Sequence, residues 1–294
     1  MFWQSVEQSI AKATGHPFAI KQKSALSGGS INAAFRITGE NGRSYFVKRN
    51  DEQGLDMFEA EADGLRELAQ SRAIRVPVPV CSGATAGNAW LVTEYIAFGR
   101  QSGTSSYLLG QQLATLHGTR TDQFGWFRDN TIGLTPQHNG KSDNWISFFR
   151  AHRLKFQFDL AAQNGFGGTL QHKGDRLLVD LDQFFDSYTP MPSLLHGDLW
   201  GGNRGFDEQG TPVLFDPAVY YGDREADMAM TELFGGFGST FYDAYNEVWP
   251  LDDGYQVRKT LYNLYHILNH ANLFGGGYAT QAESMIDGLL SEIE

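Results

Sequence analysis

The sequence predicts an α+β protein of two lobes, a small one built on an antiparallel sheet and a larger one that is mainly helical. Residues 34–49 have the pattern of a β-hairpin and residues 76–96 that of extended chain, whereas helical spacing dominates after residue 105. Residues 97–103 (AFGRQSG) form a polar, glycine-containing stretch that is typical of a hinge. We therefore place the lobes at residues 1–97 and 98–294.

In the small lobe, residues 1–20 predict a short helix and a turn. Strands are expected at residues 34–38 and 44–49, because Asn41-Gly42 between them favours a tight hairpin turn. Apolar residues recur at helical spacing over residues 57–70. Valine and proline alternate over residues 76–80, which excludes a helix and predicts extended chain at a sheet edge. A last strand is expected at residues 89–96.

In the large lobe, helical spacing predicts helices near residues 105–118, 143–164, 174–188, 224–234, 239–248, 255–273 and 278–292. Two short apolar runs, at residues 193–195 and 213–215, resemble strands and interrupt the helices. No internal repeat or low-complexity tract is present in the sequence.

Composition excludes several classes of protein. The net charge of −11 argues against non-specific binding of nucleic acid, which depends on basic patches. No apolar run approaches the roughly 18 residues of a membrane span, and the N-terminus lacks a secretory pattern. The single cysteine, Cys81, suits a reducing compartment. We expect a cytoplasmic globular protein that binds neither nucleic acid nor membranes; composition leaves its oligomeric state open.

The most informative motif lies at residues 196–203 (HGDLWGGN), where Asn203 follows Asp198 by five residues. A second aspartate, Asp216, ends the apolar run 213–215. Phosphoryl transfer needs one carboxylate to orient the attacking hydroxyl, and an amide oxygen and a second carboxylate to hold Mg²⁺. The spacing therefore predicts Asp198 as the catalytic base and Asn203 with Asp216 as metal ligands. Because Asp198 fills the role of base, we expect His196 to be a structural hydrogen-bonding residue.

A lysine and a glutamate upstream support this interpretation. Lys48 lies at the end of a predicted strand. Glu61 lies three residues after Phe58 and four before Leu65, so it falls on the apolar face of its helix. A buried carboxylate is costly unless it is paired. Lys48 is the nearest evident partner, and such a Lys–Glu pair is typical of sites that bind nucleotide phosphates.

Residues 27–32 (SGGSIN) precede the predicted hairpin. Paired glycines let backbone N–H groups approach phosphate oxygens without interference from a Cβ atom. The motif is neither a G-x-G-x-x-G loop nor a Walker A loop, and alone it is more typical of a turn. Its place ahead of Lys48 favours Gly28, Gly29, Ser30 and Asn32 as nucleotide-binding residues.

Two residues are candidates for the acceptor side of the site. Trp200 lies inside the catalytic segment among polar residues and glycines, so we expect it near the mouth of a cleft, where a sugar could stack on it. Asp227 is the second candidate, although it could instead anchor the catalytic loop by accepting its N–H groups. Asp223 and Glu225 are expected to cap the helix near residue 224. Weaker candidates are Tyr220, Tyr221, His270 and Asn272.

With these residues in place, the chain resembles the fructosamine kinase (ketosamine-3-kinase) family, in the aminoglycoside-phosphotransferase-like branch of the protein-kinase-like fold. The resemblance covers nearly the whole chain. It rests on residues 28–32 (GGSIN), 46–48 (FVK), 58–65 (FEAEADGL), 195–203 (LHGDLWGGN), 216–218 (DPA) and 232–237 (ELFGGF). The catalytic-loop pattern is shared by the whole superfamily, whereas Trp200 together with GGSIN and FGGF is typical of this family.

The resemblance implies ATP-dependent phosphorylation of the 3-hydroxyl of a ketosamine, a sugar joined through C1 to an amine, and release of the amine afterwards. It implies the same roles for the site residues as above, with ATP and Mg²⁺ as cofactors. It adds backbone contacts to adenine from the end of a strand, at Glu94, Tyr95 and Ile96. Some family members have a cysteine where this chain has Ser30, so a redox-switched disulfide dimer through that loop is not expected here.

Two alternatives remain open from the sequence. A kinase of the same fold could act on another hydroxyl, such as that of an aminoglycoside, choline or another sugar. A pseudokinase would bind nucleotide without turnover, but inactive relatives commonly lose one of the residues that are all present here: Lys48, Glu61, Asp198, Asn203 and Asp216. The sequence leaves open the length of the sugar, and whether the acceptor is free or protein-bound.

Overall fold

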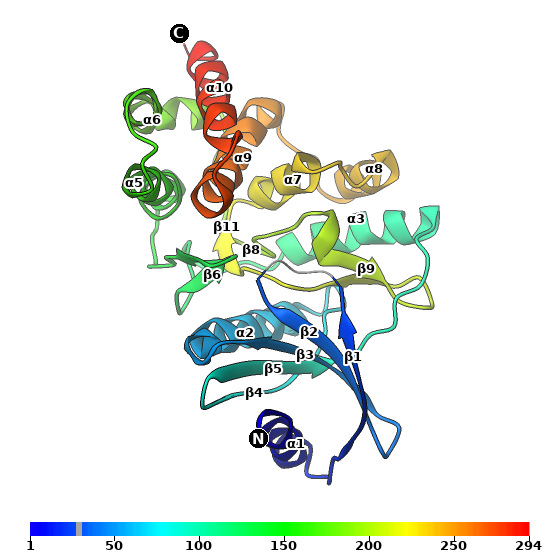
Figure 1. Cartoon of the computed structure of the whole chain (residues 1–294). Coiled ribbons are helices and arrows are strands. Elements are labelled where there is room, and N and C mark those ends of the chain that lie inside the picture. The colour runs from blue at the N-terminus through cyan, green and yellow to red at the C-terminus, as the bar shows by residue number, and fades with distance from the viewer. Residues whose placement is uncertain (28–30, 294) are drawn as a thin grey trace.

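A computed structural model describes residues 1–27 and 31–293, and it confirms the predicted α+β architecture of two lobes (Figure 1). The small lobe contains an antiparallel five-stranded sheet with the strand order β1-β2-β3-β5-β4. Its strands are β1 (Ile20–Leu26), β2 (Ala33–Gly39), β3 (Ser44–Asn50), β4 (Pro79–Thr85) and β5 (Asn88–Glu94). The 3₁₀ turn η1 (Glu52–Gly54) leads from β3 into the following helix.

Two helices, α1 (Phe2–Thr14) and α2 (Leu55–Ser71), cover opposite faces of this sheet. Val92 of β5 and Val47 of β3 pack with α1, whereas Leu91 of β5 packs with α2. Side chains alternate between the two faces of a strand, so Lys48, which follows Val47, must face α2. The alternation of β3 thus directs the lysine toward the helix that carries the predicted glutamate.

The strand β1 was not expected from the sequence. It forms the edge of the sheet next to β2, and none of its side chains is buried. An edge strand of this kind lacks the buried alternate positions that make a strand recognisable in a sequence. The extended chain expected near residues 76–80 leads into β4, which forms the opposite edge of the sheet, as predicted.

The large lobe is mainly helical (Figure 1). Its helices are α3 (Gly103–His117), α4 (Trp145–Phe149), α5 (Phe156–Gln163), α6 (Thr169–Val179), α7 (Arg224–Leu233), α8 (Ser239–Val248), α9 (Tyr255–Phe274) and α10 (Tyr278–Ser291). A π-helical turn, η2 (Arg150–Lys155), joins α4 to α5, and two 3₁₀ turns are η3 (Leu181–Phe185) and η4 (Gly201–Asn203). The helix expected over residues 174–188 is wrong, because α6 begins earlier and ends at Val179, and η3 is a separate turn.

Three pairs of short antiparallel strands lie in the large lobe: β6 (Asn130–Ile132) with β7 (Thr135–Gln137), β8 (Ser193–Leu195) with β11 (Tyr220–Gly222), and β9 (Arg204–Phe206) with β10 (Pro212–Leu214). Only β8 and β10 were expected from the sequence. At three residues each, these strands are too short to show a period of two. They nevertheless carry both ends of the catalytic segment.

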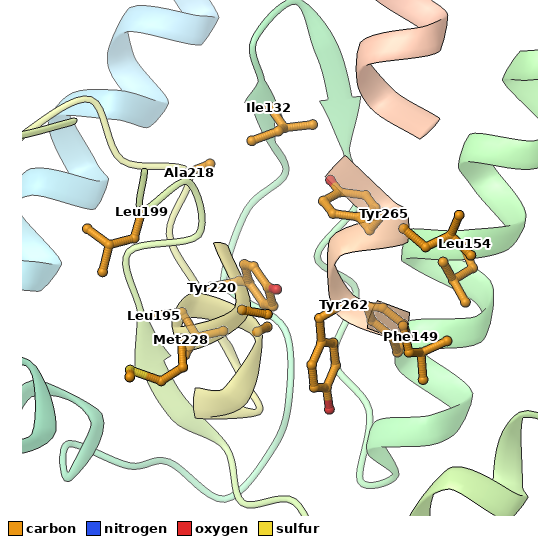
Figure 2. Packing of buried hydrophobic residues seen from close by; sticks show 14 of the residues in the cluster. Ile132, Phe149, Leu154, Leu195, Leu199, Ala218, Tyr220, Met228, Tyr262 and Tyr265 are labelled. Carbon is orange, nitrogen blue, oxygen red and sulfur yellow. The ribbon is translucent and has the colours of Figure 1, made fainter. Parts of the chain in front are cut away.

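Aromatic and aliphatic side chains fill the core beneath that segment. Figure 2 shows Tyr262 and Tyr265 of α9 beside Phe149 of α4, with Leu195 of β8 and Tyr220 of β11 nearby. The rings of Phe149 and Tyr262 meet edge to face at 5.2 Å. Burying each such side chain contributes about 1.5–3 kcal/mol, so the catalytic segment rests on a well-packed base.

The two lobes are joined by packing and by polar contacts. Leu65 and Leu68 of α2 belong to the same buried cluster as the core of the large lobe. Tyr221 Oη donates to Glu67 at 2.7 Å. The predicted division after residue 97 falls in the coil between β5 and α3. Within the described part of the chain, none of the helices has the length and apolar character needed to cross a membrane.

Candidate active site

The catalytic segment runs from β8 to η4 and is held by the chain that returns past it. Ala218 N–H donates to His196 O at 2.9 Å, and Phe215 N–H donates to Asn203 O at 3.0 Å. Gly197 has φ +84°, and a Cβ atom there would lie 2.0 Å from Ala218 O. Glycine is therefore required at this position, both by the left-handed backbone and by the close approach of the coil that contains Ala218.

His196 has the structural role that the sequence predicts. Its side chain is fully buried; Nε2 donates to Phe215 O at 3.0 Å, and Nδ1 accepts from Asp198 N–H at 3.3 Å. Burial lowers the pKa of His196, although nearby Asp227 acts in the opposite direction. A neutral imidazole with both nitrogens engaged within the loop is not placed to accept a proton from a substrate.

Asp227 anchors the loop from behind and is not at the acceptor side. Its carboxylate accepts from His196 N–H at 2.7 Å and from Gly197 N–H at 2.8 Å, and His117 Nε2 lies 3.2 Å away. The side chain is 1% exposed and is not among the residues that line the cavity described below. The proposed substrate contact of Asp227 is therefore wrong in this structure, and the alternative role as a backbone anchor agrees with the geometry. Asp223 and Glu225, which precede Asp227, were both expected to cap this helix. Asp223 caps α7, whereas Glu225 is buried against Arg258.

Asp198 and Asn203 face each other within the loop. Asn203 Nδ2 donates to Asp198 Oδ2 at 2.9 Å and to Asp198 O at 2.8 Å. Asp198 is half-buried. Burial raises its pKa to about 7, helped by the charges of Asp216 and Asp227 and opposed by the hydrogen bond from Asn203. A carboxylate with a raised pKa is a stronger base than one in water, which suits a group that must accept a hydroxyl proton.

Lys48 links Glu61 to Asp216 across the two lobes. Its Nζ atom lies 2.7 Å from Glu61 Oε1 and 2.7 Å from Asp216 Oδ1. Burial disfavours the ammonium, but the charges of Asp216 and Glu61 raise the pKa of Lys48 above its ordinary value. Lys48 is thus a fixed cation, and its predicted pairing with Glu61 is present. Asp216 has φ +57°, a conformation rare for a residue with a side chain, which is typical of a functional site.

A cavity of about 580 Å³ lies between the lobes, within the usual range for sites that bind small molecules. It brings together the predicted residues of both lobes: Asn32, Lys48 and Glu61 from the small lobe, and Asp198, Asn203 and Asp216 from the large one. Asn32 Oδ1 also accepts from Asn50 Nδ2 at 2.7 Å. One cavity therefore contains the predicted base, both predicted metal ligands and the predicted phosphate-binding lysine.

Trp200 lines this cavity and is 39% exposed, which agrees with the predicted position at a cleft mouth. Its ring packs over Gly202, where a Cβ atom would lie 2.3 Å from the indole. The Phe234 ring meets the indole edge to face, with 6.3 Å between ring centroids, and the His270 ring lies 5.1 Å from the Phe234 ring on the same measure. An aromatic wall thus extends from the catalytic loop to α9. Such a wall offers a flat surface for a sugar ring or an organic cation.

The other predicted nucleotide-binding residues are less directly placed. Gly28, Gly29 and Ser30 lie outside the described residues. Glu94, Tyr95 and Ile96 end or follow β5, and none of them lines the cavity. The Glu94 carboxylate accepts from Arg75 Nη2 at 2.7 Å, and the Glu94 backbone N–H donates to Val78 O at 2.8 Å. Their contact with adenine stays a prediction.

The weaker candidates divide between the cavity and the core. Of the four, His270 alone lines the cavity. Tyr220 is 3% exposed and belongs to the core. Tyr221 and Asn272 hydrogen bond to Glu67 and to Gln157, respectively, in contacts between elements.

The hairpin formed by β6 and β7 was missed entirely, although Asn130, Thr131, Ile132 and Gly133 all line the cavity. Gly133 has φ +64° and opens a two-residue turn between the strands. A glycine at the first position of a two-residue loop, flanked by β-branched residues, is a hairpin signal that the sequence does contain. Met230, His266 and Asn269 also line the cavity, and none of the three was expected from the sequence.

The donors near Asp216 fit a magnesium ion. Asn203 uses Nδ2 for its hydrogen bonds, including one of 3.4 Å to Asp216 O, which leaves Oδ1 for a metal. The carboxylate of Asp216 is 44% exposed and lines the cavity. Mg²⁺ prefers oxygen ligands and, in nucleotide sites, takes one or two from the protein and the rest from phosphates and water. An amide oxygen and one exposed carboxylate satisfy this requirement.

Several known proteins are similar to this chain over nearly its whole length. A family model described as fructosamine kinase matches residues 2–292. A "probable ketoamine kinase" from Synechocystis is 48% identical over 285 residues, which covers 97% of this chain and 95% of the relative. A chloroplastic protein-ribulosamine 3-kinase from rice is 42% identical, and the alignment covers 98% of this chain and 82% of the relative.

The chain belongs to the fructosamine kinase family. A crystal structure from Haemophilus somnus, assigned as a fructosamine-3-kinase, has a TM-score of 0.89 and 31% identity and covers 98% of this chain and 97% of its own. The ADP-bound aminoglycoside phosphotransferase APH(2″)-Ib has a TM-score of 0.63 at 13% identity, covering 97% and 98%, which shows a shared fold alone. This family member is an ATP-dependent phosphotransferase that acts on a hydroxyl group.

Proposed function

We propose that this fructosamine kinase family member transfers the γ-phosphoryl group of ATP, with Mg²⁺, to the 3-hydroxyl of a ketosamine. The observation that carries the proposal is that Trp200 and Asp198, two residues apart in one loop, line the same cavity. A sugar stacked on the indole would therefore have its hydroxyls within reach of the carboxylate. The relatives named as ketoamine and ribulosamine kinases support this acceptor.

Asp198 would orient the acceptor hydroxyl by accepting its hydrogen bond and would take its proton late in transfer. Asn203 Nδ2 holds the carboxylate in place through Oδ2, so Oδ1 of Asp198 is the atom available to the hydroxyl. Burial raises the pKa of Asp198 to about 7, which strengthens the carboxylate as an acceptor of the hydroxyl proton. The loop thus presents a positioned base beside the aromatic wall.

On the nucleotide side, Lys48 is held by Glu61 and would bind a phosphate of ATP. Asn203 Oδ1 and Asp216 would hold Mg²⁺, which would supply positive charge to the phosphates of ATP. Residues 28–30 would bind phosphate through backbone N–H groups, and the backbone at residues 94–96 would contact adenine. The charged half of the site therefore serves the nucleotide, and the aromatic half serves the acceptor.

Phosphorylation of the 3-hydroxyl would allow the sugar to be removed from the amine. The phosphate on C3 lies next to the C2 carbonyl, so it can leave by elimination, and the amine is then freed from the sugar. The protein would thereby take part in deglycation of glycated amines.

The cytoplasmic location stays a prediction, supported by the single cysteine, Cys81.

A substrate panel tests this proposal. We would measure ADP formation with ribulose-, fructose- and erythrulose-lysine adducts, free and peptide-bound, with and without Mg²⁺, and compare kcat/KM. Phosphate on C3 would be identified by ³¹P NMR. The expected result is Mg²⁺-dependent turnover of at least one ketosamine, with phosphate at C3.

Two outcomes would overturn the proposal. Turnover of an aminoglycoside, choline or a simple sugar, with every ketosamine inactive, would support a kinase of the same fold with another acceptor. Nucleotide binding without turnover of any acceptor would indicate a pseudokinase. Fructose and free lysine, each supplied alone, are the matched controls, because neither contains the ketosamine linkage.

A further inference from the structure

Arg153 is a fully buried cation in the π-helical turn η2. Among the described residues, no carboxylate oxygen lies within 4.0 Å of its guanidinium nitrogens. Its guanidinium instead packs over the rings of Tyr220 at 4.1 Å and Phe148 at 4.7 Å. Burying a charge without a counter-ion is costly, and π-helical turns often occur at functional sites. The position therefore needs an explanation beyond packing.

Two hydrogen bonds of Arg153 lead to the segment that follows β7, and another goes to His152 O at 3.1 Å in the same turn. Nη1 donates to His138 O at 2.6 Å, and Nη2 donates to Asn139 Oδ1 at 2.7 Å. A guanidinium has only donors, so it requires the oxygen, not the nitrogen, of the Asn139 amide. Arg153 thus determines which way this amide points.

The orientation of the Asn139 side-chain amide constrains that of a second amide, Asn130. Asn139 Nδ2 donates to Asn130 Oδ1 at 2.9 Å, so the Asn130 nitrogen must point away from Asn139. Asn130 Nδ2 then donates to Val219 O at 2.8 Å. Each amide has one donor side and one acceptor side, so reversing the first would turn the last bond into a contact between two oxygens.

A second branch ends at the neighbouring carbonyl. Tyr265 Oη donates to Gln137 Oε1 at 2.9 Å, which directs Gln137 Nε2 toward Ala218 O at 3.1 Å and Asn130 Oδ1 at 2.9 Å. Two consecutive carbonyls, of Ala218 and Val219, are therefore held by side-chain amides. They lie two and three residues after Asp216, and Ala218 N–H is bonded to the catalytic loop through His196 O.

We propose that Arg153 is a positioning residue of an amide relay, defined as Asn139, Asn130 and Gln137: Arg153 orients Asn139, Tyr265 orients Gln137, and the two branches together orient Asn130. Through the relay it fixes two walls of the cavity: the segment that begins at Asp216, and the hairpin of β6 and β7. Loss of the relay polarity should therefore weaken both Mg²⁺ binding at Asp216 and acceptor binding at the hairpin. The acceptor part rests on the proposed function, whereas the metal part does not.

The decisive variant is Asn139→Asp, because it separates positioning from stability. Aspartate has the shape of asparagine and gives Arg153 the carboxylate that it lacks, which offsets the loss of the hydrogen bonds from Asn139 Nδ2 to Asn130 Oδ1 and Arg128 O; thermal unfolding is measured to confirm that the variant is folded. It cannot donate to Asn130 Oδ1, so the branch of the relay from Arg153 breaks, although Gln137 Nε2 still donates to Asn130 Oδ1. Arg153→Met removes the donor altogether. The matched control is Arg150→Gln, which removes a cation from the same turn where it faces the surface and bonds to Asp182 and Leu178 O.

Two measurements apply to each variant. Calorimetric titration of ADP with and without Mg²⁺ reports metal binding without any turnover, and steady-state kinetics report KM for a ketosamine. For Asn139→Asp and Arg153→Met we expect the Mg²⁺-dependent gain in ADP affinity to fall about 10-fold, the size of effect typical of residues that support metal ligands. We expect the KM for the acceptor to rise about 10-fold as well. ADP binding without Mg²⁺ should be unchanged, and Arg150→Gln should match the unmodified protein.

Two results would overturn the inference. One is an Asn139→Asp protein that folds and has unchanged Mg²⁺ dependence and acceptor KM; a purely structural role for Arg153 predicts this result. The other is Arg150→Gln reproducing the changes, which would assign them to the charge of the turn. If no ketosamine is turned over by the unmodified protein, the proposed function fails, but the ADP titration still decides the role of Arg153.

Discussion

Asp198 and Asp227 lie on the two sides of one loop, and their surroundings act on them in opposite directions. Asp198 faces the cavity, and burial raises its pKa to about 7. Asp227 lies behind the loop and is more deeply buried, yet its pKa is lowered. The difference is in the donors: the cost of burial is outweighed at Asp227 by His117 and by the N–H groups of the loop.

The comparison shows that burial alone does not determine the state of a carboxylate. Asp198 accepts one side-chain hydrogen bond, from Asn203, which leaves its basicity available to a substrate. Asp227 has its lone pairs committed to backbone donors, so its charge is used to fix the loop. Substitutions in front of the loop should therefore change the rate without loss of stability, whereas substitutions behind it should change stability and tolerance to acid.

The largest effect is expected for Asp198→Asn. Loss of the base should lower kcat by about 10²–10⁴-fold. The melting temperature should stay the same or rise, because the substitution removes a carboxylate whose charge is disfavoured by burial. ADP formation and thermal unfolding, measured on the same preparation, check both parts. Turnover that survives the substitution would show that Asp198 is not the base, and a large loss of stability would break the distinction between the two sides.

The next effect concerns Gly197, where the two sides meet. In Gly197→Ala the new Cβ would lie 2.0 Å from Ala218 O on a backbone with φ +84°, so the loop must shift. We expect kcat to fall about 10²-fold, because the base is displaced, and the free energy of unfolding to fall by about 3 kcal/mol.

Gly201→Ala is the matched control in the same loop, since a Cβ there meets nothing within 4 Å. It should change the free energy of unfolding by less than about 0.5 kcal/mol. Chemical denaturation and steady-state kinetics measure both variants. Equal effects of the two substitutions would show that the contact with Ala218 O does not determine the position of the loop.

The front of the loop could be predicted from the sequence, and the reason is local. Asp198 and Asn203 have a fixed spacing, and Asp216 ends a buried run that returns to them. Lys48 and Glu61 follow from the periods of one strand and one helix, which place both side chains at the same interface. Each of these residues lies in a segment whose own pattern specifies its direction.

The back of the loop and the acceptor side could not be predicted in the same way. Asp227 and His117 meet across 110 residues, and only the packing of α3 against α8, and of both α3 and α7 against β8, brings them together. Arg153 lies in a helical pattern, where a charged residue normally points to solvent. The hairpin of β6 and β7 is too short for a periodic signal. Apart from the glycine at the turn of this hairpin, these residues depend on tertiary contacts that no local pattern records.

The smallest effect on the rate, about 10-fold in kcat, is expected for Asp227→Asn, whereas stability should fall by about 3 kcal/mol at pH 7. The pKa of Asp227 is lower in the folded protein than its ordinary value of 3.8. Its contribution to stability is therefore fully present above about pH 4 and is lost as the pH falls through the folded value. The difference in unfolding free energy between the unmodified protein and Asp227→Asn should accordingly be constant from pH 7 to about pH 5 and shrink below pH 4.

Asp122→Asn, which removes an exposed charge, is the control and should show no such dependence. A difference that stays constant into acid, or a loss of kcat equal to that of Asp198→Asn, would mean that the charge of Asp227 serves the chemistry and that the two sides of the loop do not divide their roles.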